Sequence, residues 1–277
     1  MATVTSNDVR RLRDFTGAGM MDCKKALEEA GNDFDEAVEL LRKKGQKVAA
    51  KRQEQEASEG LVLAKASEDG KEGVLLTVNC ETDFVAKNDE FSSFARDVLK
   101  VALEEKPATV EDLKEKNYPE SELSISEKLT EIIGKIGEKI EFDTVKRVEA
   151  ETVVAYEHPG NKIAALVGMN KTGQEALAKE LAMQIAAMDP VALNEETVPE
   201  DIKERELENG REQARQEGKP DDIIEKIAEG KLKKFYKENT LLQQPFIKDN
   251  DKSVAEYLKD NDPELTVTTF ERYSLEG

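Results

Sequence analysis

The residue types that most often perform chemistry in enzymes are sparse in this 277-residue chain. His158 is the single histidine, and no G-x-S-x-G or H-E-x-x-H pattern provides a nucleophile elbow or a zinc site. Every Gly-Lys pair is followed by a residue other than Ser or Thr, which excludes a phosphate-binding P-loop. We therefore expect a binding protein rather than an enzyme, with no catalytic, cofactor or metal site. A hydrolase that uses scattered carboxylates is an alternative from another class.

The charge balance bears on the kind of partner. The chain has 41 basic and 60 acidic residues, a net charge of -19, whereas nucleic-acid binding requires Lys and Arg to neutralise phosphates. We therefore expect no direct nucleic-acid partner. The densest basic cluster lies at 42–52, and we interpret it as a solvated helix end followed by a linker rather than a binding patch.

The cysteines and the apolar runs indicate the cellular compartment. Cys23 and Cys80 belong to no C-x-x-C pair, so we expect buried thiols in a reducing compartment. No apolar run approaches the length of a membrane span, and the start at residues 1–4 lacks the charged-then-apolar order of a signal peptide. These features predict a cytoplasmic protein without a membrane partner.

Three short helices are predicted for residues 5–45. Thr5 and Asp8 resemble a capping pair, and the spacing of Val9, Leu12 and Phe15 indicates a helix face. The second helix should start near Asp22, and a third should follow Gly31 with a cap at Asn32 or Asp33 and a packed stripe at Phe34, Ala37, Val38 and Leu41. Residues 46–58 are interpreted as a linker, helical or disordered.

The next segment has the pattern of a hairpin followed by a helix. Residues 60–66 and 73–80 are β-rich and are separated by a turn at Asp69-Gly70. The second of these runs is nearly all apolar, as in a strand that is covered on both faces. Apolar residues from Phe91 to Ala102 then follow helical spacing, with Asn88 or Asp89 as the cap. Residues 79–88 should connect the strand to this helix.

The same order recurs later in the chain. Residues 151–158 and 162–170 are β-rich around Pro159-Gly160-Asn161, and a helix is expected over 176–188. Between the two copies, a helix that contains residues 129–136 runs into Gly137. Residues 197–236 form two charged helical stretches around Gly218-Lys219-Pro220.

Two segments carry a resemblance to a known family. Thr16-Gly-Ala-Gly-Met-Met-Asp-Cys-Lys-Lys-Ala-Leu27 and Asn79-Cys-Glu-Thr-Asp-Phe-Val-Ala-Lys-Asn88 closely resemble the two signatures of elongation factor Ts, and the chain is identified as a member of that family. The resemblance implies an α+β fold with a UBA-like three-helix domain and linker at 1–55. A core subdomain N at 56–143 and a related core subdomain C at 144–277 would follow. The stretch at about 197–236 would be an inserted coiled-coil hairpin.

The resemblance also implies a function. Members of the family promote GDP release from elongation factor Tu, and an Asp-Phe pair, here Asp83 and Phe84, inserts beside the nucleotide site and disturbs the magnesium ion. Thr82 and Val85 would shape the turn around this pair. Further contacts to elongation factor Tu, in its GDP-bound and nucleotide-free forms, are implied for Lys24, Lys87, Asn88, Ile136, Gly137, His158 and Ile247. A homodimer through the core or the coiled-coil arm is a further option.

The residues taken alone allow other interpretations. Phe84 could cap the local core beneath the helix that contains Phe91, and Asp83 could serve only as a helix N-terminal carboxylate. His158 would then be a surface turn residue. An adaptor that recruits proteins through its three-helix module, with a purely structural core, is the alternative function.

Overall fold

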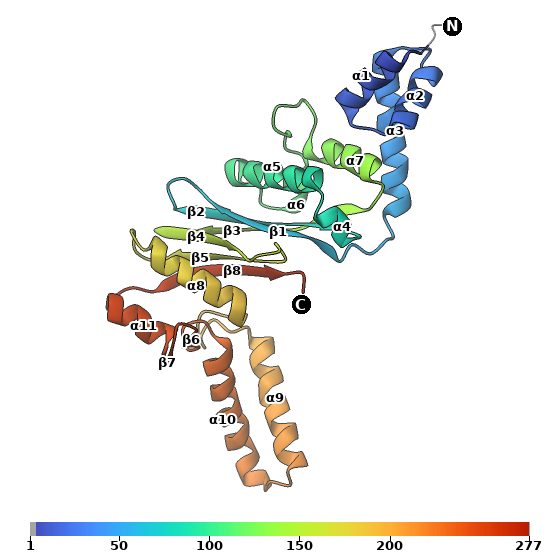
Figure 1. The fold of residues 1–277 in the computed structure, drawn as a ribbon. Coiled ribbons are helices and arrows are strands. Elements are labelled where there is room, and N and C mark those ends of the chain that lie inside the picture. Colours follow the sequence, from blue (N-terminus) through green and yellow to red (C-terminus); the bar gives the residue numbers. More distant parts are fainter. Residues whose placement is uncertain (1–3, 277) are drawn as a thin grey trace. The chain divides into compact units, whose positions relative to one another are not determined.

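The α+β class is confirmed by the computed structural model, which describes residues 4–276 (Figure 1). The chain forms two compact units. Unit 1 comprises 1–63, 76–145 and 275–277, and unit 2 comprises 64–75 and 146–274. Residues 1–3, which entered the argument about a signal peptide, lie outside the described part. Within residues 4–276, no helix combines the length and the apolar character needed to cross a membrane. The domains at 1–55, 56–143 and 144–277 remain our proposal.

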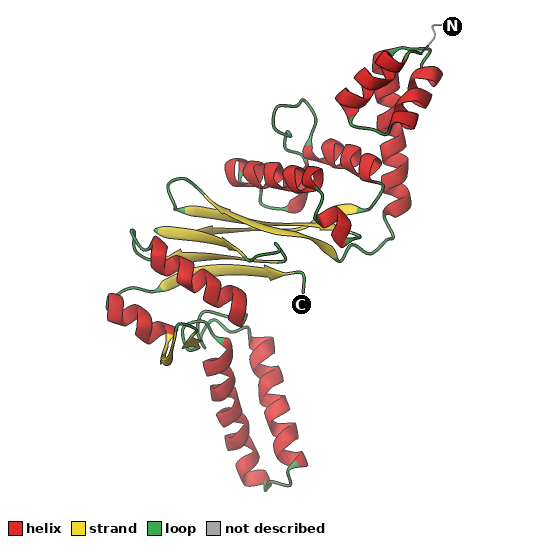
Figure 2. Ribbon diagram, in the orientation of Figure 1, coloured by secondary structure: helices red, strands yellow, loops and turns green. Residues whose placement is uncertain are grey.

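The N-terminal segment consists of three helices, α1 (Ser6–Thr16), α2 (Met20–Glu29) and α3 (Phe34–Arg52) (Figure 2). Thr5 and Asp8 form the expected capping box, and Asp33 caps α3. Helix α2 begins at Met20, two residues before the predicted start, because Gly19 supplies the extended N-cap. Helix α3 continues to Arg52, so the first part of the predicted linker is helical; its Lys, Gln and Ala residues are good helix formers.

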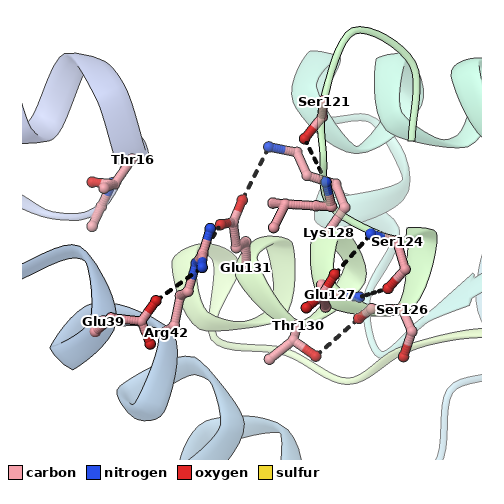
Figure 3. Close-up of polar contacts among 12 residues, drawn as sticks. Thr16, Glu39, Arg42, Ser121, Ser124, Ser126, Glu127, Lys128, Thr130 and Glu131 are labelled. Atoms are coloured by element: carbon pink, nitrogen blue, oxygen red, sulfur yellow. Dashed lines mark hydrogen bonds and ion pairs between the residues drawn. The ribbon is translucent and has the colours of Figure 1, made fainter. Parts of the chain in front are cut away.

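Helix α3 packs closely against α7 (Ile125–Ile136), and two glycines make this approach possible. A Cβ atom added to Gly134 would lie 2.7 Å from the Cα atom of Gly45, which real side chains do not tolerate. Arg42 of α3 contributes ion pairs at the same crossing, to Glu39 at 2.9 Å and to Glu131 of α7 at 3.6 Å (Figure 3). The three-helix segment therefore packs through α3 on α7, the helix whose C-cap is Gly137.

A three-stranded sheet of order β1-β2-β3 contains β1 (Glu59–Ala66), β2 (Glu72–Cys80) and β3 (Ile140–Glu149). The turn between β1 and β2 falls at the predicted Asp-Gly pair, where Gly70 has a φ of 65°. Strand β3 was not predicted. The elements after β2 are α4 (Asp83–Ala86), α5 (Asp89–Glu105) and α6 (Val110–Lys114). Helix α5 packs against β3, with the ring centroids of Phe94 and Phe142 5.9 Å apart.

Unit 2 repeats the hairpin and helix, as the sequence predicted. Strands β4 (Thr152–Glu157) and β5 (Ile163–Met169) are antiparallel, and α8 (Glu175–Met188) packs on them. A strand that the sequence did not predict, β8 (Val267–Ser274), pairs antiparallel with β5 and completes a sheet of order β4-β5-β8. The short strand β6 (Pro245–Phe246) and helix α11 (Val254–Asn261) contribute Phe246, Val254 and Leu258 to the same core. Strand β7 (Asp249–Ser253) pairs antiparallel with β6.

The charged stretches form an antiparallel helical hairpin of α9 (Glu200–Gln216) and α10 (Asp221–Asn239) (Figure 1). Its interface uses small residues, because a Cβ atom on Gly210 would lie 2.9 Å from the Cα atom of Ala228. Arg211 of α9 forms a two-pronged ion pair with Glu225 of α10, with N–O distances of 2.8 and 2.7 Å. The polar helix α9 thus obtains the partner that its composition requires.

Candidate functional site

The segment between β2 and α5 is a single helical turn, α4, that presents one aromatic side chain to solvent. Phe84 is 81% exposed, whereas its neighbour Val85 is 8% exposed. The alternative that Phe84 caps the core beneath α5 is therefore wrong. Successive residues of a helix point about 100° apart. Burial of Val85 on the inner side of α4 thus turns Phe84 outward, while the inner face of α5 is already filled by its own residues Phe91 and Phe94.

Asp83, Lys87 and Asn88 have defined local roles around this aromatic ring. Asp83 opens α4, where a carboxylate is favoured by the helix dipole, and one of its oxygens lies 2.7 Å from the Nζ atom of Lys87. Asn88 accepts hydrogen bonds from the backbone N–H groups of Glu90 and Phe91 and so caps α5. The predicted site residues from 82 to 88 therefore form one continuous turn between two rigid elements.

The base of α4 is bound to the loop that follows α7. The hydroxyl of Thr82 donates to both carboxylate oxygens of Glu138, at 3.0 and 3.1 Å. The adjacent Glu81 accepts a 2.6 Å hydrogen bond from the backbone N–H of Lys139. These contacts bring the turn next to the end of α7, where Gly137 is the left-handed C-cap with a φ of 84°. Ile136 and Gly137, predicted from a distant part of the sequence, thus lie beside α4.

The remaining predicted contacts are placed elsewhere. Lys24 is an exposed residue of α2 that pairs with Glu28 at 3.7 Å. His158 is exposed at the β4–β5 turn in unit 2, where its Nδ1 atom lies 3.0 Å from the Tyr156 hydroxyl. Ile247, also in unit 2, sits between β6 and β7, and its backbone N–H donates to the buried Gln184 at 2.8 Å.

The three-helix module carries three large exposed apolar side chains, Phe15, Met20 and Met21, which are here named its apolar surface. Phe15 was expected on the packed face of α1, but it is 69% exposed, and its ring forms a T-shaped pair with the ring of Phe34, with the centroids 5.4 Å apart. The inner positions of α1 are Val9 and Leu12, and Phe15 lies too far around the helix to join them. Met20 and Met21 are also more than half exposed. Two adjacent methionines at a helix start were the available signal for this surface.

Cys80, the last residue of β2, is buried directly under the turn. Burial raises the pKa of its thiol from 9.0 to about 12, and the nearby carboxylate of Glu138 adds to the shift. The thiol donates a hydrogen bond to the backbone oxygen of Thr82 at 3.2 Å. Cys23 is buried as well, and both cysteines are free, as predicted. The burial of Cys80 and the nearby carboxylate of Glu138 thus both disfavour the thiolate at the base of α4.

This thiol predicts a stability change at alkaline pH. Because the pKa of Cys80 is higher in the folded than in the unfolded chain, its contribution is complete below pH 9.0 and is lost as the pH rises toward about 12. The loss should not exceed about 1.4 kcal/mol per pH unit. Guanidinium unfolding at about pH 8 and about pH 10.5 measures it, and the Cys80→Ala variant should show a smaller decrease. Equal decreases in the two proteins would contradict the assignment.

Comparison with known proteins identifies relatives along the whole chain. A family model described as "Elongation factor TS" matches residues 81–276. A protein named elongation factor Ts from Christiangramia forsetii is 50% identical over 277 residues, which cover 99% of this chain and 100% of the relative. Proteins of the same name from Amoebophilus asiaticus and Prosthecochloris aestuarii are 47% and 41% identical, over 97% and 99% of this chain and 98% and 99% of the relatives.

Proposed function

Because this chain belongs to the elongation factor Ts family, we propose that it performs nucleotide exchange on elongation factor Tu with Phe84 as the working side chain. Membership of the family assigns it a role in translation elongation. The proposal adds the mechanism: Phe84 and Asp83 enter the partner beside its guanine nucleotide, disturb the bound magnesium ion and release GDP, so that GTP can bind.

The exposure of Phe84 is the observation that supports this mechanism most strongly. An aromatic side chain that is 81% exposed in the free protein has apolar area available for a partner. Burying about 150–250 Å² of ring at about 25 cal/mol per Å² would contribute roughly 4–6 kcal/mol before the cost of association. Half of that gain would match a typical coupling free energy between two ligands.

Magnesium explains how a small intrusion could release the nucleotide. The ion requires nearly ideal octahedral geometry and bridges phosphate oxygens to protein oxygens. Displacement of its ligands by the inserted ring would therefore weaken GDP binding strongly. The coupling is reciprocal, so GDP must weaken the binding of this protein to the same extent.

Asp83 would act together with the ring. Its carboxylate is half-exposed and is paired with Lys87, which is itself 76% exposed at its side chain. An exposed ion pair of this kind contributes little stability, so losing the contact with Lys87 on binding would cost little. Near the phosphates or the magnesium ligands, the same negative charge would repel the nucleotide.

A direct assay tests the proposal. Elongation factor Tu loaded with fluorescently labelled GDP is mixed with this protein and an excess of unlabelled GDP, and the loss of fluorescence reports release. We expect acceleration that increases with protein concentration and then saturates. Release at the spontaneous rate, from a partner shown to be active with another exchange factor, would refute the proposal.

The three-helix module supports a second, adaptor-like role. Phe15, Met20 and Met21 give it an exposed apolar surface, which in a monomeric protein commonly marks a binding site. We infer that this surface strengthens partner binding without taking part in nucleotide release. The variant with Phe15→Ser and Met21→Ser should raise the half-saturating concentration in the assay above and leave the maximal rate intact. A lower maximal rate would contradict this division of roles.

A further inference from the structure

Two carboxylates hold the turn that carries Phe84, and we propose that Glu81 and Glu138 are positioning residues for nucleotide exchange. The inference rests on the proposed function, because it concerns how the working side chain is presented. Neither residue need touch elongation factor Tu. Their role is to fix the direction of α4 before the partner arrives.

Two adjacent residues after β2 are hydrogen-bonded to two adjacent residues before β3. Glu81 accepts from the backbone N–H of Lys139 at 2.6 Å, and Thr82 donates to Glu138 at 3.0 and 3.1 Å. Together these bonds join the residues just after β2 to the residues just before β3. Hydrogen bonds to a carboxylate are shorter and stronger than those between neutral groups.

The hydroxyl of Thr82 has a single proton to donate. That proton is donated in the hydrogen bonds to Glu138. The hydroxyl oxygen is therefore left to accept a hydrogen bond from the N–H of Val85, 3.4 Å away. Thr82 is the N-cap of α4, and this acceptor role is what an N-cap must provide. Glu138 therefore orients the hydroxyl of Thr82, and this hydroxyl, as the N-cap, orients α4.

Helix α4 is only four residues long. Its helical hydrogen bonds include those from Ala86 to Thr82 and from Lys87 to Asp83, each 3.2 Å long. A helix this short has no intrinsic stability in water. The buried side chain of Val85 sets which side of α4 faces inward. The direction of the helix axis must come from its two ends, and the carboxylates supply the anchor at the first of them. Asn88, as the cap of α5, supplies the other.

Glu81 is also bound by a residue of a third element, helix α3. Its second oxygen lies 3.1 Å from a guanidinium nitrogen of Arg52, the last residue of α3, and its side chain is 15% exposed. A carboxylate with two donors and little solvent access has one preferred geometry. The turn is thereby fixed by contacts with α3 and with the loop after α7, and by its covalent connection to strand β2.

A kinetic experiment with the full-length protein tests this role. The maximal rate of labelled-GDP release from elongation factor Tu and the half-saturating concentration are measured for Glu138→Ala, Glu81→Ala and the conservative Glu138→Gln. We expect the two alanine variants to lower the maximal rate about tenfold, with half-saturation changed less than about twofold, because the ring still binds but is misdirected. Glu138→Gln keeps an acceptor oxygen and should recover most of the rate.

A double-mutant cycle separates positioning from general damage. Thr82→Val and Glu138→Ala remove the two partners of one hydrogen bond, so the double variant should be about as slow as either single variant. Additive losses would overturn the assignment. The matched control is Glu111→Ala on α6, whose side chain is 80% exposed and which should behave as wild type. If Glu138→Ala is partly unfolded by circular dichroism, Glu138→Gln and Thr82→Val carry the test.

The outcomes also distinguish this inference from the proposed function. Phe84→Ala is measured in the same series. If it slows release while the Glu81 and Glu138 variants retain the wild-type maximal rate, the exchange mechanism stands and the positioning role is refuted. If Phe84→Ala itself keeps the wild-type rate, the proposed function fails first. A higher half-saturating concentration with an unchanged maximal rate would also refute positioning, because it would place the carboxylates in binding.

Discussion

Replacement of Phe84 by alanine is expected to slow GDP release from elongation factor Tu at saturating concentrations of this protein by about 30- to 140-fold. The estimate takes half of the roughly 4–6 kcal/mol that burial of the ring could contribute, at about 1.4 kcal/mol per factor of ten. The ring is 81% exposed in the free protein, so its loss should change the free energy of unfolding by less than about 0.5 kcal/mol. Binding should persist, because the other contact surfaces are unchanged.

Stopped-flow measurement of labelled-GDP release gives the maximal rate and the half-saturating concentration separately, and guanidinium unfolding gives the stability. Ile223→Ala is the matched control, since Ile223 is an exposed apolar residue on the helical hairpin and its loss should leave the maximal rate unchanged. An unchanged rate for Phe84→Ala would remove the aromatic ring from the mechanism. A large loss of stability would instead mean that the ring packs against its own chain.

The glycine crossing of α3 and α7 predicts the largest effect on stability. Gly134→Val would place a Cβ atom 2.7 Å from the Cα atom of Gly45, and that neighbour is backbone and cannot move aside. The two helices must separate, and overpacking of this kind typically costs about 1–3 kcal/mol or more. The Arg42–Glu131 ion pair spans the same crossing and should be lost with it.

The free energy of unfolding in guanidinium, followed by circular dichroism, measures this effect. Ser126→Val, at an exposed position of the same helix (Figure 3), introduces the same β-branched side chain without the clash and should cost less than about 0.7 kcal/mol. If the Gly134 variant were as stable as the Ser126 variant, the close approach of α3 and α7 would not hold in solution.

Local signals in the sequence located the turn that carries the site. Asn88, one of the two predicted caps of α5, accepts hydrogen bonds from the backbone N–H groups of Glu90 and Phe91, which is the local role that an Asn before a helix fills. The Asp-Gly pair marked the β1–β2 turn because Gly70 adopts a positive φ. Such signals depend only on neighbouring residues and are therefore legible in one sequence. They placed residues 82–88 between a buried strand and an amphipathic helix.

The elements that were missed depend on distant partners. Strand β8 carries polar residues, and its place is fixed by pairing with β5, far earlier in the chain. In strand β3, apolar and charged residues alternate only over the first half, at Ile140 and Phe142, so the strand pattern is incomplete. The bonds from Glu81 and Glu138 join segments separated by 58 and 56 residues, and no periodicity encodes them. The exposure of Phe84 likewise followed from the burial of Val85, which sequence spacing alone could not decide.

The central claim is that the ring of Phe84 enters elongation factor Tu beside its guanine-nucleotide site, and photo-cross-linking at this position tests it most directly. Phe84 is replaced by p-benzoylphenylalanine, the complex with nucleotide-free elongation factor Tu is irradiated, and the linked peptides are identified by mass spectrometry. The same probe at Ile223 serves as the control. We predict links to partner peptides that line the nucleotide and magnesium site. Links only to peptides remote from that site, or none in a complex that forms normally, would contradict the account.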